Sequence, residues 1–221
     1  MQDLANSRVL VLGLGASGLA MALWARRCGA QVTVWDSRAA PPQADALHEQ
    51  APDITLLSGD LAADVVEAST LLLKSPGLSP RDAKIASALA AAAKTGIAVR
   101  GELDLFVQAL TELERTRGYA PQVIAITGTN GKTTVTALTA LLVERAGRRV
   151  ARAGNIGPSL LATLSHALDD EDVAASASAE QAQASAVGAV ESPRFACLPE
   201  VWVLELSSLD RKSTRLNSSH Q

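Results

Sequence analysis

The sequence predicts an α/β protein whose parallel sheets are covered by helices. Two apolar runs, Val9–Leu12 and Val123–Thr127, each lead into a glycine-containing loop that is followed by a helical stretch. Aromatic residues make up only 3% of the 221 residues, whereas apolar residues make up 48%. The core must therefore consist mainly of Leu, Val, Ala and Ile, a composition typical of helices packed on a buried parallel sheet.

The first domain is expected at about residues 1–100, as a Rossmann-like, doubly wound parallel sheet. Strand-like runs alternate there with helical stretches, which is the pattern of repeated strand–helix–strand units. The first helix leads to Arg27 and ends at Gly29, and the Ala-rich stretch Arg81–Lys94 is a second helix. The expected strands are Val9–Leu12, Val32–Trp35, Ile54–Leu57, Thr70–Leu73 and Ile97–Val99.

The second domain is expected at residues 101–209 and starts with a connecting helix, Gly101–Arg117. The segment Leu168–Pro199 contains an Ala- and Ser-rich stretch without an amphipathic period. We therefore interpret about residues 169–199 as a surface insertion, with disorder in its middle. Residues 210–221 are polar and fit neither domain, so we interpret them as a tail. The expected strands and helix are Val123–Thr127, Thr133–Ala146 (the helix), Val150–Ala153 and Val201–Leu206.

The composition excludes several classes of protein. Lys and Arg number 20 against 23 Asp and Glu, a formal net charge of −3 that is unlike a strongly basic nucleic-acid binder. No apolar run approaches the ~20 residues of a membrane-spanning helix. Cys28 and Cys197 are too few for a disulfide framework, and residues 1–8 lack the layout of a signal peptide. We therefore expect a cytoplasmic protein.

The segment Thr127–Thr134, with the sequence TGTNGKTT, carries the strongest functional signal. It lies between a buried strand and a helix, where glycines let backbone N–H groups turn inward and the helix N-terminus favours an anion. Lys132 can reach the β- and γ-phosphates of a nucleotide, and the Thr133 hydroxyl can ligate Mg²⁺. The strict phosphate-loop pattern requires glycine where Ile126 stands, so the match is to a variant. The alternative is a tight turn with a chance lysine.

Glu205 interrupts the apolar run Val201–Leu206. A lone carboxylate in a buried strand is unfavourable unless it is paired or binds a metal. At the end of a strand beside a phosphate loop, it would face the Mg²⁺ site. The alternative is a carboxylate that reaches solvent from the end of the strand.

Gly13, Gly15 and Gly18 follow the first strand with the spacing of a dinucleotide fingerprint, and Asp36 stands 18 positions after Gly18 (36 − 18). This pattern alone favours NAD or FAD. The same architecture can hold another nucleotide, such as a UDP group, and the glycines can also serve only to pack helix on strand. Asn155, after another expected strand, can donate to a phosphate or sugar oxygen or can be an ordinary turn residue.

Six short motifs, in this order, resemble those of the Mur ligases and cover about residues 5–208. Each motif is modest by itself, but the ordered set is specific. The resemblance is strongest to Mur ligases that add D-glutamate to UDP-N-acetylmuramoyl-L-alanine, since the ligase that adds L-alanine more often carries His at Asn130. The motifs are Gly13–Gly18, Ser75–Gly77, Gly101–Phe106, Thr127–Thr134, Gly154–Gly157 and Leu204–Ser208.

The resemblance implies an ATP-dependent, amide-forming ligase of peptidoglycan precursor synthesis. ATP would phosphorylate the terminal carboxylate of UDP-N-acetylmuramoyl-L-alanine, and the amine of D-glutamate would attack the resulting acyl phosphate. Lys132 and Glu205 would be catalytic, and Thr133 and Glu205 would hold Mg²⁺. ATP would bind to Gly128, Thr129, Asn130, Gly131, Lys132, Thr133 and Thr134. The UDP-sugar substrate would bind to Leu14, Ala16, Ser17, Asp36, Ser37, Arg38, Gly77 and Asn155.

The resemblance stops after Ser208, where Leu209–Lys212 stands in place of the family's Phe-Gln-Leu. The family's later Mg²⁺-binding histidine, carbamylated lysine, adenine contacts and D-glutamate-binding domain have no counterpart. We therefore expect an incomplete ligase that is inactive alone and has an unstable second half, whereas the full-length family implies a monomer. No nucleic-acid or membrane partner is expected.

Two other classes of function remain open on the sequence alone. An NAD(P)-dependent oxidoreductase is supported only by the first glycine motif, and it would bind NAD but no UDP-sugar. A nucleotide-binding module without ligase chemistry would bind ATP but would have no affinity for a UDP-muramoyl peptide.

Overall fold

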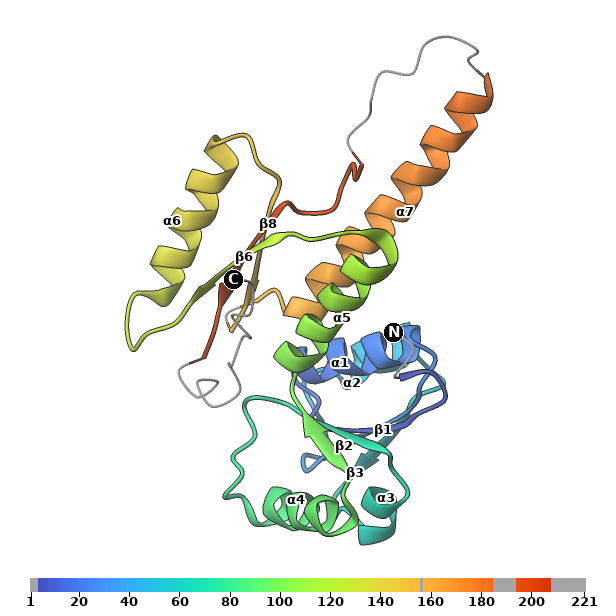
Figure 1. Cartoon of the computed structure of the whole chain (residues 1–221). Helices are drawn as coiled ribbons and strands as arrows, with labels where there is room; N and C mark the ends of the chain where they lie inside the picture. Colours follow the sequence, from blue (N-terminus) through green and yellow to red (C-terminus); the bar gives the residue numbers. More distant parts are fainter. Residues whose placement is uncertain (1–3, 156, 185–193, 208–221) are drawn as a thin grey trace. The chain divides into compact units, whose positions relative to one another are not determined.

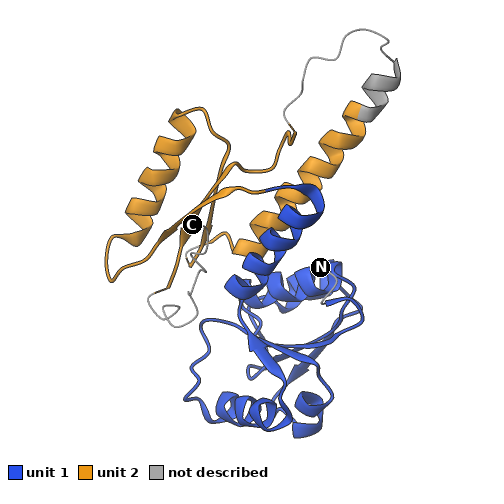
Figure 2. Ribbon diagram, in the orientation of Figure 1, with its two compact units in different colours: residues 1–119 blue, residues 120–221 orange. Residues whose placement is uncertain are grey.

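The computed structural model describes residues 4–155, 157–184 and 194–207. The chain divides into two compact units, residues 1–119 and residues 120–221 (Figure 2). Each unit contains its own parallel sheet, and each is described by itself below. Residues 210–221, predicted to be a tail, lie outside the described residues.

Unit 1 is built on a five-stranded parallel sheet with the order β3-β2-β1-β4-β5. Helices α1 and α2 lie on one face of this sheet and α3 and α4 on the other (Figure 1). This is the doubly wound arrangement that the sequence predicts. The strands are β1 (Arg8–Leu12), β2 (Gln31–Asp36), β3 (Thr55–Ser58), β4 (Leu71–Lys74) and β5 (Ala98–Arg100). The helices are α1 (Ala16–Arg27), α2 (Ala44–Gln50), α3 (Ala63–Glu67), α4 (Ala83–Thr95) and α5 (Glu102–Arg117).

The core of unit 1 follows from the alternation of side chains along its strands. Leu10, Leu12 and Leu72 face the side covered by α3 and α4, where they pack with Ile85 and Trp35. All five predicted strands are present within about one residue at each end. The short helices α2 and α3 were not predicted, because each buries a single side chain and therefore leaves no periodic pattern in the sequence.

Helix α5 belongs to unit 1, which extends through Tyr119. Leu105, Phe106 and Leu113 on this helix are buried, and the helix contacts α1. The Ser17 hydroxyl on α1 donates to the Glu102 carboxylate on α5, at 2.5 Å. A polar contact therefore joins the connecting helix to α1, and its apolar side chains are buried.

Unit 2 contains a three-stranded parallel sheet with the order β6-β8-β7. The strands are β6 (Gln122–Ile126), β7 (Val150–Gly154) and β8 (Val201–Glu205), and the helices are α6 (Lys132–Arg145) and α7 (Leu160–Ala184). Figure 1 shows α6 and α7 on opposite sides of these strands. The last strand in sequence occupies the middle of the sheet, so its carboxyl end lies between those of the other two.

Helix α7 corrects the interpretation of the Ala-rich segment. The predicted surface insertion, about residues 169–199, is helical through Ala184. Alanine is the strongest helix former, so a helix does not require an amphipathic period there. Most described side chains after Glu171 are exposed, and Val173 is 70% exposed. This part of the helix therefore has no apolar stripe in the sequence. The rest of the predicted insertion through residue 193 lies outside the described residues.

One face of α6 is apolar and open to solvent. Val135, Leu138 and Leu142 are 50–59% exposed, at a spacing that places them along one side of the helix. Val123 and Ile124 on the edge strand β6 are also exposed. The described part of unit 2 therefore leaves apolar surface uncovered. Among the described residues, no helix combines the length and apolar composition needed to cross a bilayer.

A buried carboxylate fastens the segment that enters β8. Glu171 on α7 accepts hydrogen bonds from the backbone N–H groups of Ala196, Cys197 and Leu198, at 3.0, 2.7 and 2.9 Å. Burial alone would raise the pKa of Glu171, but these three bonds and the charge of Arg149 outweigh it and lower the pKa. The ionised carboxylate thus holds the chain in place just before the central strand.

We predict that Glu171→Gln destabilises unit 2 by ~1–3 kcal/mol at neutral pH, because buried N–H groups lose a charged acceptor. The folded pKa lies below the unfolded value, so this stabilisation is present above the unfolded pKa and is lost as the pH falls through the folded pKa. Amide hydrogen exchange of β8 should show a large difference between Glu171→Gln and the wild type at pH 7, and in a pH series this difference should shrink as the pH falls through the folded pKa. Asp170→Asn, on an exposed neighbour, is the control; equal protection of β8 in both variants at pH 7 would contradict the role.

Candidate functional site

The predicted phosphate loop joins β6 to α6. The strand ends at Ile126, and the helix begins at Lys132 after the N-cap residue Gly131, whose φ of +75° favours glycine. Gly131 has no side chain with which to cap the helix. The N–H groups of the first turn are therefore available to an anion, as at other phosphate-binding helix termini.

Lys132 folds back over this loop. Its ammonium donates to the backbone carbonyl of Gly128, at 2.8 Å. A lysine ammonium carries three N–H donors, so two remain for phosphate oxygens even with this bond in place. The side chains of Thr129, Asn130 and Thr133 are exposed around it, as is that of the predicted ATP-binding residue Thr134.

Glu205 is buried at the carboxyl end of the central strand β8. The residue is 4% exposed, and its Oε1 atom is buried without a hydrogen-bond partner among the described residues. In the sheet, Glu205 is in register with Ile126 on one side and Gly154 on the other. The carboxylate is therefore placed at the same sheet edge as the start of the phosphate loop, as predicted from the sequence.

The residues at this edge fit a magnesium ion. A buried carboxylate oxygen without a partner is unfavourable, and a cation relieves the cost. The carboxylate of Glu205 and the hydroxyl of Thr133 are the hard oxygen ligands that Mg²⁺ prefers. The described residues contain no cluster of three or more His, Cys, Asp or Glu side chains. Such an ion would thus take its remaining ligands from phosphate oxygens and water, as Mg²⁺ commonly does.

Gly154 is a site residue that the sequence reasoning missed. Its φ is +135°, and a Cβ atom at this position would lie 2.1 Å from the backbone oxygen of Glu205. The next residue, Asn155, donates its backbone N–H to that same oxygen at 2.9 Å, and its side chain is exposed. A glycine at the last position of a strand, before a polar residue, was the available signal.

The carboxyl edge of the sheet in unit 1 carries the second group of predicted residues. Asp36 is 2% exposed and accepts four hydrogen bonds. Its Oδ2 accepts from the Leu14 N–H and from Arg38 Nη2, both at 2.7 Å. Its Oδ1 accepts from the Arg38 N–H at 2.9 Å and from Arg38 Nε at 2.8 Å.

These bonds fix the charge of Asp36. The side-chain bond from Arg38 is the main cause that lowers the pKa of Asp36 to about 2, and the Leu14 N–H adds to it while burial opposes it. Asp36 is thus ionised at neutral pH and holds both the glycine loop and the Arg38 guanidinium. Half of the Arg38 side chain remains exposed, so its outer N–H groups face solvent.

The glycines of the first loop have different roles. A Cβ atom on Gly18 would lie 1.9 Å from the backbone oxygen of Gly13, and Gly13 itself has a φ of +88°. The Ser75 hydroxyl donates to that same oxygen at 3.0 Å. These two glycines are therefore required for packing, the alternative left open by the sequence. Gly15, by contrast, has open space around it and leaves room for a ligand at the start of α1.

The remaining predicted substrate residues divide by exposure. Leu14 is fully buried and its N–H is bonded to Asp36, so the predicted contact of Leu14 with a ligand is not available in this structure. Ser17 is half-buried and donates to Glu102. Exposed residues at the carboxyl ends of β1, β2 and β4 remain for a ligand, and they are Ala16, Ser37, Arg38 and Gly77.

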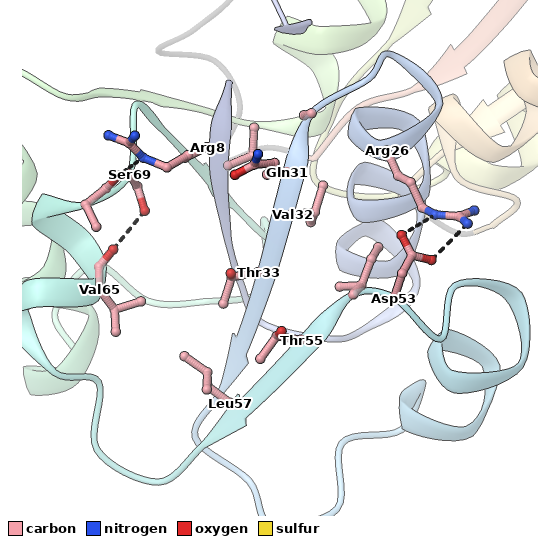
Figure 3. A pocket seen from close by; sticks show the side chains of 14 residues that line it. Arg8, Arg26, Gln31, Val32, Thr33, Asp53, Thr55, Leu57, Val65 and Ser69 are labelled. Atoms are coloured by element: carbon pink, nitrogen blue, oxygen red, sulfur yellow. Dashed lines mark hydrogen bonds and ion pairs between the residues drawn. The ribbon is translucent and has the colours of Figure 1, made fainter. Parts of the chain in front are cut away.

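A pocket in unit 1 lies at the opposite edge of the sheet. Figure 3 shows side chains that line this pocket, such as Arg8 and Gln31 from the amino-terminal ends of β1 and β2. The volume of the pocket is about 560 Å³. The Arg26 guanidinium and the Asp53 carboxylate form an ion pair on its wall, at 2.8 Å. None of the predicted site residues lines it. This pocket is therefore separate from the edge at which ligands bind in doubly wound folds.

Two models of known protein families match the two parts of the chain that carry these sites. The chain matches the model for the Mur ligase MurD-like, N-terminal domain over residues 7–101, and the model for the Mur ligase middle domain over residues 126–219. The chain belongs to the Mur ligase family. The first Mur ligase domain contains the glycine loop and Asp36, and the middle domain contains the phosphate loop and Glu205. The resemblance stated from the sequence motifs is thereby confirmed.

Curated relatives agree with the family models. The chain is 51% identical over 210 residues to the UDP-N-acetylmuramoylalanine–D-glutamate ligase of Albidiferax ferrireducens, a match that covers 94% of this chain and 36% of the relative. It is 45% identical over 212 residues to the ligase of the same name from Ralstonia nicotianae, with coverage of 96% and 38%. The chain thus spans little more than a third of the length of these relatives.

Among solved structures, that of a pseudomurein peptide ligase type C from Methanothermus fervidus is similar over 66% of this chain and 27% of its own chain, at 24% identity and a TM-score of 0.40.

We predict that Lys132→Ala weakens nucleotide binding about tenfold or more without unfolding either unit. The substitution removes a charge-assisted hydrogen bond to phosphate, worth roughly 1.5–3 kcal/mol, and leaves the glycine backbone in place. Titration with a fluorescent ATP analogue, beside a circular dichroism melt, measures both effects. Arg145→Ala, which removes an exposed cation from the other end of α6, is the control. Equal affinity in the Lys132 variant and the wild type would show that the phosphates bind elsewhere.

Proposed function

We propose that this chain supplies the UDP-substrate and ATP sites of a ligase that adds D-glutamate to UDP-N-acetylmuramoyl-L-alanine in peptidoglycan precursor synthesis. The observation that carries the proposal is the unpartnered, buried Glu205 carboxylate at the same sheet edge as the phosphate loop. Support also comes from the identity with relatives that bear this name. The chain spans 36–38% of those relatives, so the complete activity is proposed for a protein of their length.

In the proposed ATP site, the first-turn N–H groups of α6 and the Lys132 ammonium bind the β- and γ-phosphates. Lys132 would leave the Gly128 carbonyl, or share its donors, when phosphate oxygens are present. Thr133 and Glu205 would hold Mg²⁺, which neutralises charge on the phosphates and orients the γ-phosphoryl group. These residues act by position and charge, since phosphoryl transfer requires little covalent chemistry from the protein.

The proposed reaction has two steps. A carboxylate oxygen of UDP-N-acetylmuramoyl-L-alanine attacks the γ-phosphorus of ATP, which forms an acyl phosphate and releases ADP. The amine of D-glutamate then attacks the acyl carbon, forms the amide and expels inorganic phosphate. The protein's part is to bring the carboxylate and the phosphoryl group together, which removes much of the entropic cost of the encounter.

The proposed UDP-substrate site lies at the carboxyl edge of the sheet in unit 1. Arg38 offers an exposed cation whose orientation is fixed by Asp36, and Gly15 leaves the start of α1 open. Ala16, Ser37 and Gly77 complete this edge. From the family resemblance alone, Asn155 is proposed to contact the diphosphate–sugar region of the substrate. We place the protein in the cytoplasm, where ATP and UDP-linked precursors are made, and we infer a monomer.

The arrangement of Asp36 argues against NAD as the cofactor of the oxidoreductase alternative, although an arginine at this position is compatible with the 2′-phosphate of NADP. In NAD-binding folds of this type, the acidic residue after the second strand accepts hydrogen bonds from the ribose hydroxyls. Here both carboxylate oxygens of Asp36 are occupied by Leu14 and Arg38, and the group is 2% exposed. A cation, rather than a carboxylate, is therefore presented to the ligand. A nucleotide-binding module without ligase chemistry would share the ATP site but would not bind the UDP substrate.

The chain by itself is proposed to lack ligase activity. The exposed apolar side of α6 and the open edge strand β6 point to a middle domain that needs further elements. Unless D-glutamate is held beside the acyl phosphate, the contribution of proximity to the second step is lost.

We predict that calorimetry on the 221-residue chain detects binding of UDP-N-acetylmuramoyl-L-alanine and no binding of NAD. Arg38→Ala should weaken the UDP-substrate affinity about tenfold, because a charge-assisted hydrogen bond to the ligand is lost. Arg81→Ala, an exposed cation elsewhere in unit 1, is the matched control. Binding of NAD, or an ATP-binding chain with no affinity for the UDP substrate, would favour one of the two alternatives and overturn the proposal.

A further inference from the structure

Thr136 has a buried hydroxyl group that neither the packing of the fold nor the proposed mechanism explains. It lies on α6, one turn after Lys132, and is 1% exposed. Its Oγ1 atom is buried and has no hydrogen-bond partner among the described residues. A buried hydroxyl without a partner is unfavourable, so its presence in place of an apolar residue requires an explanation.

Four threonines on other helices of this chain satisfy their hydroxyls locally. The hydroxyls of Thr95, Thr111, Thr116 and Thr163 each donate to the carbonyl four residues earlier, at 3.0, 3.0, 2.6 and 2.8 Å. Threonine in a helix has two accessible rotamers, one of which makes this bond. Thr136 does not make this bond, although its side chain is buried. Its hydroxyl is therefore available to a partner outside helix α6.

The complementary group is Glu205. Among the described residues of unit 2, the buried side-chain atoms without a partner are Thr136 Oγ1 and Glu205 Oε1. One is a hydroxyl that can donate, and the other is a carboxylate oxygen that can only accept when ionised. Helix α6 packs on β8, the strand that carries Glu205. The two unpartnered atoms thus belong to a helix and a strand that pack against each other.

The position of Thr136 on α6 strengthens this link. Residues three apart share one face of a helix, so Thr136 lies on the same face as Thr133. Thr133 is the residue expected to ligate the cation together with Glu205. The face of α6 that carries the cation ligand therefore also carries the unpartnered hydroxyl, one turn deeper under the phosphate loop.

We propose that Thr136 is a positioning residue for the cation site. When nucleotide and cation are bound, its hydroxyl donates to the Glu205 carboxylate, directly or through one bridging water, and fixes the orientation of that carboxylate. This inference rests on the proposed role of Glu205 as a cation ligand. Hydrogen-bond partners of metal ligands commonly contribute 10–100-fold to metal affinity, so the effect is measurable.

Two substitutions separate positioning from packing. Thr136→Val keeps the shape and removes the hydroxyl, whereas Thr136→Ser keeps the hydroxyl and removes a methyl group. If the hydroxyl positions Glu205, Thr136→Val raises the Mg²⁺ concentration at half-maximal ATP-analogue binding about tenfold, with an unchanged or higher melting temperature. Thr136→Ser then keeps the wild-type Mg²⁺ dependence within about twofold, with a lower melting temperature. A packing residue would give the reverse pattern, with the loss of the methyl group as the harmful change.

The experiment is a titration of a fluorescent ATP analogue at a series of Mg²⁺ concentrations, on the full chain, with melts alongside. In the Glu205→Gln background, Thr136→Val should have no further effect on Mg²⁺ dependence, since the two residues act as a pair. Wild-type Mg²⁺ dependence in Thr136→Val, or equal loss in Thr136→Ser, overturns this inference alone if Glu205→Gln still abolishes the dependence. If ATP binding by the wild-type chain is independent of Mg²⁺, both the proposed function and this inference are overturned.

Discussion

The placement of β8 between β6 and β7 is the constraint on which the rest of unit 2 depends. Because the strands are parallel, this order brings Glu205 into register with the end of the phosphate-loop strand and with Gly154. Gly154 permits the approach, since any side chain there would collide with the Glu205 backbone oxygen. The Glu171 carboxylate fastens the chain just before β8. A carboxylate, a loop of N–H donors and an amide side chain are thereby gathered at one sheet edge.

The two units each place a carboxylate at the end of a parallel strand, with opposite outcomes. Asp36 accepts four hydrogen bonds, and the Arg38 guanidinium is the main reason that its pKa is lowered to about 2. It organises its own loop and presents Arg38 to a ligand. Glu205 has a buried oxygen without a hydrogen-bond partner among the described residues, and we propose that a cation arriving with the nucleotide binds there. One carboxylate is a structural anchor, and the other is the proposed binding group.

Most strands, and the chemistry of the phosphate loop, could be predicted from the sequence, because continuous apolar runs and polar interruptions are visible along one chain. Glu205 was found for that reason. The helices α2 and α3 and the later turns of α7 were missed because they bury few side chains and leave no period. Gly154 and Thr136 could not be assigned roles, since their significance depends on which strand or helix lies opposite. The burial of Leu14 and the saturation of Asp36 are likewise properties of contacts between distant segments.

The central claim is that a divalent cation bound with the nucleotide sits against Glu205. Paramagnetic Mn²⁺ tests it directly, because Mn²⁺ takes the oxygen ligands of Mg²⁺ and broadens the resonances of nearby nuclei. With Mn²⁺ and an ATP analogue bound to the full chain, the account predicts broadening of the amide resonances of Thr133, Asn155 and Leu206, and its loss in Glu205→Gln. Broadening confined to other parts of the chain, or unchanged by Glu205→Gln while the nucleotide stays bound, would contradict the account.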